Sequence, residues 1–327
     1  MAEGLINSIA RLRVIEKRLL TKELVSRLRA AGDYPDAVKT LREAGFGAGF
    51  DRAGGDELEG LIAAHLDETY RLVDELMPER LAFVTDIFRM RHDLTNLKLL
   101  YKKRLLGEEL EDTATDGGGI FPRESLIKAV SSGDYSGLPK PLKNALEELD
   151  VRTYKNPDAR LVSDTLDGAY LAMGLACKNG FVREYFSALA DFTALISIVR
   201  GAEASLPKGE YGAETLAAVK EALAASPEKI PGILKTPFDS SPLKAAARAG
   251  FEEYLKSHRV SALESARDDY LISLAGIGRS DIDSPAPIVG FMLAREREAE
   301  VVRLILTVKR SGLPMSVTDE RSVTLYG

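Results

Sequence analysis

The 327-residue chain has no tryptophan, a single cysteine and only three histidines. The lone cysteine, Cys177, excludes an intramolecular disulfide, and we expect it to be a small buried apolar residue. His65, His92 and His258 are widely separated, and none has a second histidine four residues away, as in the His-Glu-x-x-His pattern of helical zinc sites. The sequence therefore predicts no metal site.

Long apolar runs are also missing. The longest uncharged apolar stretch, Gly168 to Cys177, is far shorter than the roughly 20 residues that a membrane-spanning helix needs. No charged-then-apolar signal peptide opens the chain, which favours a cytoplasmic protein that is at most peripheral to a membrane. The net charge of −6 argues against a nucleic-acid partner, because such binding rests on Lys and Arg that neutralise phosphates.

Catalytic constellations are absent from the sequence as well. No Gly-x-Ser-x-Gly elbow exposes a nucleophile. Gly45 to Gly49 and the triplet Gly117 to Gly119 follow no strand and lack the Gly-Lys-Ser/Thr ending of a nucleotide loop, so we interpret both as flexible connections. Asp268-Asp269 could begin a magnesium-binding helix only with a carboxylate three residues later, where Ile272 stands.

Near the carboxyl end, acidic and basic residues are interleaved within one helical stretch. Acidic residues two apart point to different faces of a helix, which favours intrahelical ion pairs over paired catalytic carboxylates. The residues are Glu296, Glu298 and Glu300 with Arg295, Arg297 and Arg303. We predict no catalytic residue, no cofactor, no bound metal and no small-molecule substrate, which leaves an all-α metal-dependent enzyme as the least favoured class.

What the chain does have is helical periodicity. A hydrophobic content of 45% is ample for a packed core, and alternating β-branched runs are almost absent. Helix starts are marked by Asp56 with Glu59, by Ser226-Pro227 and by Ser241-Pro242. We predict an all-α fold.

An internal repeat of about 100 residues organises these helices. The segment Asp93-Leu-Thr-Asn96-Leu-Lys98 returns as Asp191-Phe-Thr-Ala194-Leu-Ile196, and Gly32-Asp33-Tyr34 returns as Gly133-Asp134-Tyr135. Two matches at nearly one offset indicate repeated units, since a tripeptide alone recurs by chance.

Each unit has the same order of elements: short helices, a long helix, a break and a second long helix. The breaks fall at Met77-Pro78, at Asn179-Gly180 and over Gly276 to Pro287, and the long stretch before the third break runs from Leu243 to Leu274. We predict three similar units: residues 1–110 with the N-terminal helix, 111–208, and 209–327 with the C-terminal tail. Linkers are expected at Asp112 to Gly119 and at Ala202 to Gly212.

The last long helix of each unit carries an apolar stripe at spacings of three and four, which places these side chains on one helix face. We interpret the stripes as core. They comprise Ile87, Met90, Leu94, Leu97, Tyr101 and Leu105; Phe186, Leu189, Phe192, Leu195 and Val199; and Phe291, Leu293, Val302, Ile305 and Val308.

The helix that ends the first unit is basic, and two interpretations of its charge stay open. A solvated helix face is one. The other is an electrostatic docking surface for an acidic protein partner or for anionic headgroups. If the helix docks a partner, the candidate protein-interaction residues are Arg89, Arg91, Lys98 and Lys102.

Several segments in matching order resemble one known family. They are Ala10-Arg-Leu-Arg13 with Glu16 and Leu19-Leu20, the Asp93-x-x-Asn96 helix, Pro287 to Phe291 followed by Ala294 to Ile305, Lys309 to Gly312, Asp319 to Arg321, and Leu325 to Gly327. The sequence resembles the C subunit of archaeal and bacterial V-type (A-type) ATP synthases, the family of the eukaryotic V-ATPase d/AC39 subunit. It departs from that family after Pro314, where Met315 to Ser322 lacks the usual Glu-x-Ile-Arg-Glu-x-Leu-like helix.

The resemblance implies three similar helical units around a pseudo-threefold axis, forming a funnel. It also implies a non-catalytic central-stalk subunit of a rotary ATPase or ATP synthase, peripheral to the cytoplasmic side of the membrane. The implied partners are the membrane proteolipid ring and the central-shaft subunits, which it couples during proton or sodium transport. The alternative is an open helical-repeat scaffold unrelated to rotary ATPases.

Overall fold

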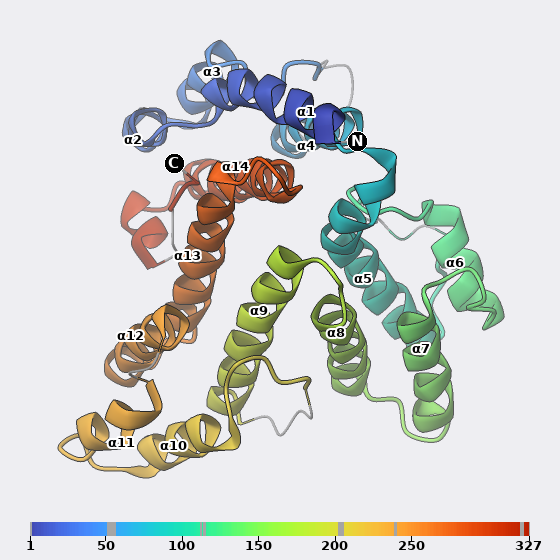
Figure 1. The fold of residues 1–327 in the computed structure, drawn as a ribbon, viewed down its shortest axis with the longest axis vertical. Helices are drawn as coiled ribbons and strands as arrows, with labels where there is room; N and C mark the ends of the chain where they lie inside the picture. Colours follow the sequence, from blue (N-terminus) through green and yellow to red (C-terminus); the bar gives the residue numbers. More distant parts are fainter. Residues whose placement is uncertain are drawn as a thin grey trace. The chain divides into compact units, whose positions relative to one another are not determined.

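The computed structural model describes residues 2–50, 57–111, 113, 116–201, 206–238, 241–320 and 324–326. Helix accounts for 75% of the structure, and none of the described residues forms a strand, so the predicted all-α class is confirmed. The chain divides into two compact units (Figure 1). Unit one comprises Met1–Ala82 with Ser240–Gly327, and unit two comprises Phe83–Asp239.

Unit one is built around its last long helix, α14. This helix packs against α4 and α13 and also contacts α1, α2 and α3. Because neighbours surround it, α14 is buried almost continuously from Ala286 to Ala299. The elements of the unit are α1 (Ala2–Ile15), η1 (Glu16–Arg18), α2 (Lys22–Ala30), α3 (Tyr34–Glu43), α4 (Glu57–Leu76), η2 (Glu79–Leu81), α12 (Pro242–Ser257), α13 (Ser261–Ile277), η3 (Gly278–Ser280), α14 (Ala286–Arg310) and η4 (Met315–Glu320).

In unit two, consecutive helices from α7 to α11 pack on one another. Its elements are α5 (Ala82–Leu106), α6 (Arg123–Ser132), α7 (Lys140–Thr153), α8 (Ala159–Leu175), α9 (Gly180–Val199), α10 (Ala213–Ala224) and α11 (Ile230–Phe238). Phe186 lies between Phe88 and Tyr170, with ring centroids 5.6 and 5.0 Å away. Gly174 faces the Phe186 ring, and a Cβ there would overlap it, so α8 and α9 approach closely because residue 174 is glycine.

The three predicted helix starts differ in how they compare with the structure. Ser241 caps α12, accepting the backbone N–H of Lys244 at 3.3 Å, with Pro242 in the first turn. The helix start predicted at Ser226-Pro227 is wrong. The Lys229 N–H donates to the Ser226 carbonyl and closes a turn, and α11 begins only after this turn, at Ile230. Asp56 lies outside the described residues.

The predicted single stretch from Leu243 to Leu274 is wrong, because the structure divides it into α12 and α13. His258 ends α12 in the left-handed region, with φ 54°. Its N–H still bonds the Tyr254 carbonyl at 2.7 Å, so the turn closes before the chain changes direction. The other breaks are confirmed: α4 ends at Leu76, and Asn179 caps α9 by accepting Val182 N–H at 3.1 Å.

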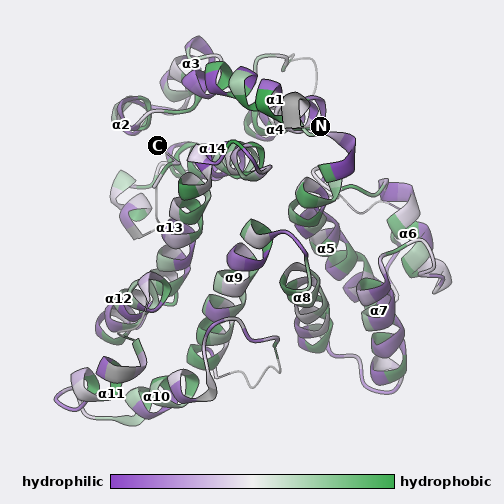
Figure 2. Cartoon of the chain, viewed as in Figure 1, coloured by the Kyte–Doolittle hydropathy of each residue, from purple (hydrophilic) through white to green (hydrophobic). Residues whose placement is uncertain are grey.

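The apolar stripes are largely core, as predicted. Hydrophobic and hydrophilic residues share each helix (Figure 2), and most stripe residues are buried, with Leu105, Leu189 and Val199 only partly so.

The buried position predicted for Cys177 is wrong, because it lies just beyond α8 and is partly exposed. Within the described ranges, no helix combines the length and the hydropathy required to cross a bilayer.

Both predicted linkers lie between helices, after α5 and after α9, although residues 112, 114–115 and 202–205 lie outside the described part of the chain. The division into units 1–110, 111–208 and 209–327 and their threefold arrangement stay predictions.

Candidate interaction site

The four basic residues predicted to bind a partner are half-buried on α5 and contact other parts of unit two. Arg89 donates from Nε to the Gly118 carbonyl at 3.2 Å and from Nη2 to the Gly119 carbonyl at 3.1 Å. Arg91 donates to the ring of His92 at 3.5 Å. The Arg89 side chain therefore lies on the α5 face that holds the following linker.

The other two predicted residues lie one turn apart and contact α8. Lys98 forms an ion pair with Asp167, and Lys102 donates to Ser163 Oγ at 2.7 Å. The two pairs run in opposite directions along the two helices, so they cross-link α5 to an antiparallel α8. Whether these cations also dock a partner stays a prediction.

Asp93, the first residue of the repeated motif, is fully buried and holds the linker after α5. Its carboxylate accepts the backbone N–H of Ile120 at 2.8 Å and of Phe121 at 3.3 Å. Burial raises the pKa of Asp93, and the two N–H bonds oppose that rise.

Asn96 completes this attachment through a reciprocal pair of hydrogen bonds. Its Nδ2 donates to the Asp116 carbonyl, and its Oδ1 accepts the Asp116 N–H, both at 2.8 Å. The Asp116 carboxylate bonds Nδ1 of His92 at 2.6 Å. Three neighbouring α5 positions therefore fix the path of the linker.

Asp191 does the same in the second copy of the motif. Its carboxylate accepts the backbone N–H groups of Gly209 at 3.0 Å, Glu210 at 2.6 Å and Tyr211 at 3.1 Å. Burial raises the pKa of Asp191 to about 6, against the lowering effect of these three bonds. The shared element of the internal repeat is thus a carboxylate that binds the backbone of the segment after its helix.

Glycine makes this approach possible in both copies. A Cβ at Gly119 would overlap the Asp93 carboxylate, and one at Gly209 would overlap the Ser187 carbonyl and Asp191. The interpretation of Gly117 to Gly119 as a flexible connection is therefore wrong, because Arg89 binds the carbonyls of Gly118 and Gly119 and Asp93 binds the N–H of the next residue, Ile120.

The third long helix uses the same position with opposite polarity. Asp93, Asp191 and Arg297 are each the twelfth residue of α5, α9 and α14. Arg297 donates from Nε to the Thr324 carbonyl at 3.2 Å, so it too holds the segment that follows its helix. The three long helices therefore share the position and the role of this residue, whereas the residue type differs.

The repeated tripeptides, by contrast, occupy different local structures. Asp33 caps α3, accepting Asp36 N–H at 2.9 Å, whereas Gly133 ends α6 with φ 71° and Tyr135 is buried against Arg104. Both tripeptides lie between two short helices, but their backbones perform different turns.

Residues of the family-like segments at the two ends of the chain meet in unit one. The buried carboxylate of Glu16 bonds Arg13 at 2.8 Å and Arg279 at 3.1 Å. Arg279 lies over the Tyr326 ring, 5.8 Å from its centroid. Burial, together with the Glu16 charge, raises the pKa of Tyr326 to about 12. Arg321 and Gly327 lie outside the described residues.

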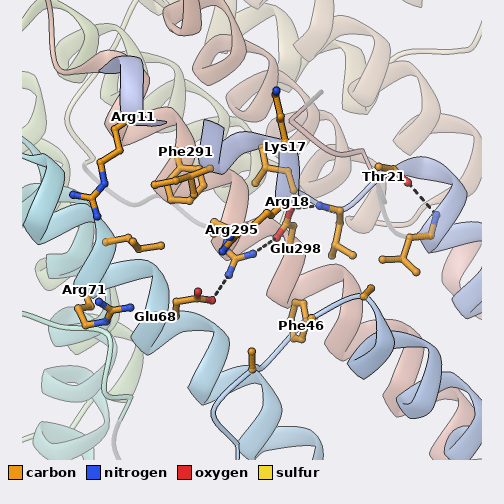
Figure 3. A pocket seen from close by; sticks show the side chains of 18 of the residues that line it. Arg11, Lys17, Arg18, Thr21, Phe46, Glu68, Arg71, Phe291, Arg295 and Glu298 are labelled. Carbon is orange, nitrogen blue, oxygen red and sulfur yellow. Dashed lines mark hydrogen bonds and ion pairs between the residues drawn. The ribbon is translucent and has the colours of Figure 1, made fainter. Parts of the chain in front are cut away.

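A cleft of about 680 Å³ opens in unit one between η1, the loop after α3, α4 and α14 (Figure 3). Its apolar lining includes both aromatic and aliphatic side chains. The lining residues labelled in Figure 3 are Arg11, Lys17, Arg18, Thr21, Phe46, Glu68, Arg71, Phe291, Arg295 and Glu298.

Arg295 lies between two carboxylates on the cleft wall (Figure 3). It bonds Glu68 at 3.0 Å, Glu298 at 3.3 Å and the Thr69 hydroxyl at 3.2 Å. The other oxygen of Glu298 accepts Leu20 N–H at 2.5 Å, which ties the segment after η1 to α14. Burial raises the pKa of Glu298 to about 7, while Arg295 opposes that rise.

His65 supports this wall from behind. It is completely buried, its ring stacks on Phe46 with centroids 3.8 Å apart, and its Nε2 lies 3.0 Å from the Arg295 carbonyl. Burial and the nearby Arg295 charge lower the pKa of His65 to about 3, so it is neutral at physiological pH.

The intrahelical ion pairs predicted for α14 are confirmed for Arg295–Glu298 and Arg297–Glu300. Sequence reasoning missed that most of these charges are buried and also bind other helices, as Arg303 does with Glu59 of α4. A signal was present in the sequence. Apolar runs at Pro287 to Ala294 and Val301 to Val302 flank the charges, which is typical of a helix buried on all sides.

The cleft residues Lys17, Arg18 and Glu68 were also missed, because residues far apart in the sequence form the cleft. Asp268 pairs with Arg267 and Arg297. Among the residues that the structure describes, no cluster of three or more metal-ligating side chains occurs.

Comparisons with known proteins identify relatives of this chain. Residues 8–321 match the sequence profile of the family described as ATP synthase (C/AC39) subunit. The chain is 23% identical over 297 residues to the C subunit of the V-type sodium ATPase of Enterococcus hirae, covering 85% of this chain and 84% of that protein. It is 23% identical over 344 residues to the C subunit of the A-type ATP synthase of Thermococcus kodakarensis, covering 95% and 88%.

Proposed function

Because the chain belongs to the ATP synthase (C/AC39) subunit family, we propose that it is the central-stalk subunit joining the rotor shaft to the membrane proteolipid ring of a V- or A-type ATPase. In this role it is peripheral to the cytoplasmic face of the membrane, carries out no chemistry itself and turns with both partners during proton or sodium transport.

The family match over residues 8–321 carries this proposal, because it spans both compact units rather than one helix pair. The two relatives are named as the C subunits of a sodium ATPase and of an ATP synthase. A helical scaffold unrelated to rotary ATPases does not account for that match.

The internal attachments suit a part that transmits torque. A rotor adapter must resist bending, and packed side chains with satisfied buried polar groups deform little. Asp93, Asp191 and Arg297 each tie the chain after a long helix back to that helix. We propose that the three helical units predicted from the internal repeat are arranged around a pseudo-threefold axis and form a funnel that joins shaft and ring.

Detergent-solubilised membranes test the proposal directly. A tagged copy of the chain should recover the proteolipid ring and the shaft subunits. Deletion should leave ATP hydrolysis by the released catalytic part but abolish ATP-driven ion transport. Recovery of neither partner from an intact assembly, or coupled transport by complexes that lack the chain, would overturn it.

A further inference from the structure

The cleft of unit one carries more positive than negative charge. Arg11, Lys17, Arg18, Arg71 and Arg295 line it, together with three carboxylates, Glu68, Glu75 and Glu298. The excess lies at the exposed edge, because Glu68 and Glu298 are both bound to Arg295.

The exposed cations are only partly neutralised. Arg11 and Arg71 share one carboxylate, Glu75, at 3.1 and 2.7 Å, and their side chains stay 58% and 64% exposed. Lys17 and Arg18 are exposed on η1 and have no ion pair or hydrogen bond with any described side chain. Four exposed cations thus line the cleft with only one carboxylate, Glu75, that is not bound to Arg295, which creates a local positive potential.

The cleft also offers apolar surface beside these charges. Phe46 and Phe291 line it, and Leu24 and Leu72 are only partly buried there. A volume of about 680 Å³ lies in the range of sites that bury a ligand, where apolar walls with a few polar groups are usual. The lining therefore matches an occupant with both negative charges and apolar side chains.

We propose that this cleft binds an acidic peptide segment with apolar side chains, its carboxylates paired with Lys17 and Arg18 and its apolar side chains on Leu24 and Leu72. That the segment comes from another subunit of the same complex rests on the proposed function. Association guided by such exposed charges is fast and weakened by salt.

The backbone around the cleft favours carboxylates over a phosphate compound. Phosphate sites use free backbone N–H groups at a glycine-rich loop or helix start. Here the N–H groups of Gly45 and Phe46 bond the carbonyls of Arg42 and Leu41. The start of α2 is capped by Thr21, which accepts Leu24 N–H at 3.2 Å.

Charge reversal of the unpaired cations tests the cleft on the purified full chain. The probe is a fluorescent synthetic peptide in which glutamate and leucine alternate, with a glutamine–leucine peptide and ATP as comparators. The double variant Lys17→Glu/Arg18→Glu should bind the glutamate peptide roughly tenfold more weakly or worse, with an unchanged melting temperature. The control Arg27→Glu/Lys39→Glu reverses two exposed cations of unit one away from the cleft and should bind normally.

Three outcomes would overturn the proposal: equal binding by the two double variants, equal binding of the glutamine peptide, or tighter competition by ATP than by the glutamate peptide. In the assembled complex, a photo-crosslinking residue at Leu72 should label an acidic segment of another subunit, and Lys17→Glu/Arg18→Glu should abolish that label. Labelling of a segment without acidic residues would also overturn the proposal. A chain that binds the peptide but recovers no ATPase subunit contradicts the proposed function instead.

Discussion

Asp93 and Asp191 show how one buried carboxylate can organise a segment that lies outside its own helix. Each accepts two or three consecutive backbone N–H groups of a glycine-containing loop. Its partners are main-chain groups of the same unit, so its role is structural.

Asn96→Ala tests the attachment with a neutral group. The substitution removes both hydrogen bonds that Asn96 forms with the Asp116 backbone, and we expect a loss of roughly 1–3 kcal/mol in the free energy of unfolding. Chemical denaturation measures it. Thr95→Ala, at an exposed neighbouring position, should change stability by less than about 0.5 kcal/mol. Equal effects of the two substitutions would contradict the attachment.

Asp191 should give stability a distinct pH dependence. Its folded pKa of about 6 lies above the ordinary value of 3.8, so between these values the folded protein binds more protons than the unfolded chain. The free energy of unfolding therefore falls as the pH rises from about 4 to about 6, by an amount on the order of 2 kcal/mol.

Asp191→Asn cannot ionise and should lack this fall. Denaturant titrations at pH 4, 5, 6 and 7 compare the two proteins, and the wild-type advantage should shrink as the pH rises. Parallel profiles would show that Asp191 does not titrate in this range.

At the scale of elements, periodic helices could be predicted from the sequence and their interruptions only in part. The proline of Met77-Pro78 and the glycine of Asn179-Gly180 predict a break, because these residue types commonly mark helix ends. The break at His258 has no glycine or proline, and a non-glycine residue with positive φ is uncommon. That turn depends on the packing of α12 against α13, and the hydrophobic periodicity of the sequence carries no information about this packing.

The candidate site could be predicted less well than the helices, for the same physical reason. Arg89 and Lys98 were chosen for their charge, but charge alone does not tell a cation bound to its own chain from a free one. The Arg89 partners, Gly118 and Gly119, become neighbours only when the linker folds back onto α5.

The two linkers can be tested through their glycines. Gly209→Ala and Gly119→Ala each place a Cβ where an oxygen lies, so the linker must move away from α9 or α5. We expect each to lower the free energy of unfolding by roughly 1–3 kcal/mol, as overpacking does. Gly212→Ala and Gly117→Ala are matched controls, because no atom lies within 4 Å of their added Cβ. Controls as damaging as the test variants would contradict the close approach.

At the scale of the whole molecule, the chain has two compact units and both chain ends belong to unit one. Residues near the two ends bind one another there, as Glu16 does with Arg279. The functional prediction for α5, docking of an acidic partner, belongs to this scale because it concerns assembly rather than folding.

A charge swap separates docking by Lys98 from its internal role. Lys98→Glu removes the ion pair with Asp167 and reverses a charge, so it should weaken both folding and assembly. Lys98→Glu with Asp167→Lys restores the internal pair. If Lys98 docks an acidic partner, the double variant should fold like the wild type yet assemble more weakly, most clearly at low salt. Wild-type assembly by the double variant would leave Lys98 an internal contact only.

The anchor at the twelfth position of α5, α9 and α14 sets where this chain can be recombined with a homologue. A carboxylate there needs a following loop that presents N–H groups, whereas Arg297 needs one that presents a carbonyl. With a homologue whose anchor has the opposite polarity, a crossover placed between the anchor and its loop would join a donor to a donor or an acceptor to an acceptor. Chimeric proteins should therefore inherit residues 93–121 or 191–211 as intact blocks. Their junctions should lie in α5 or α9 before the anchor residue.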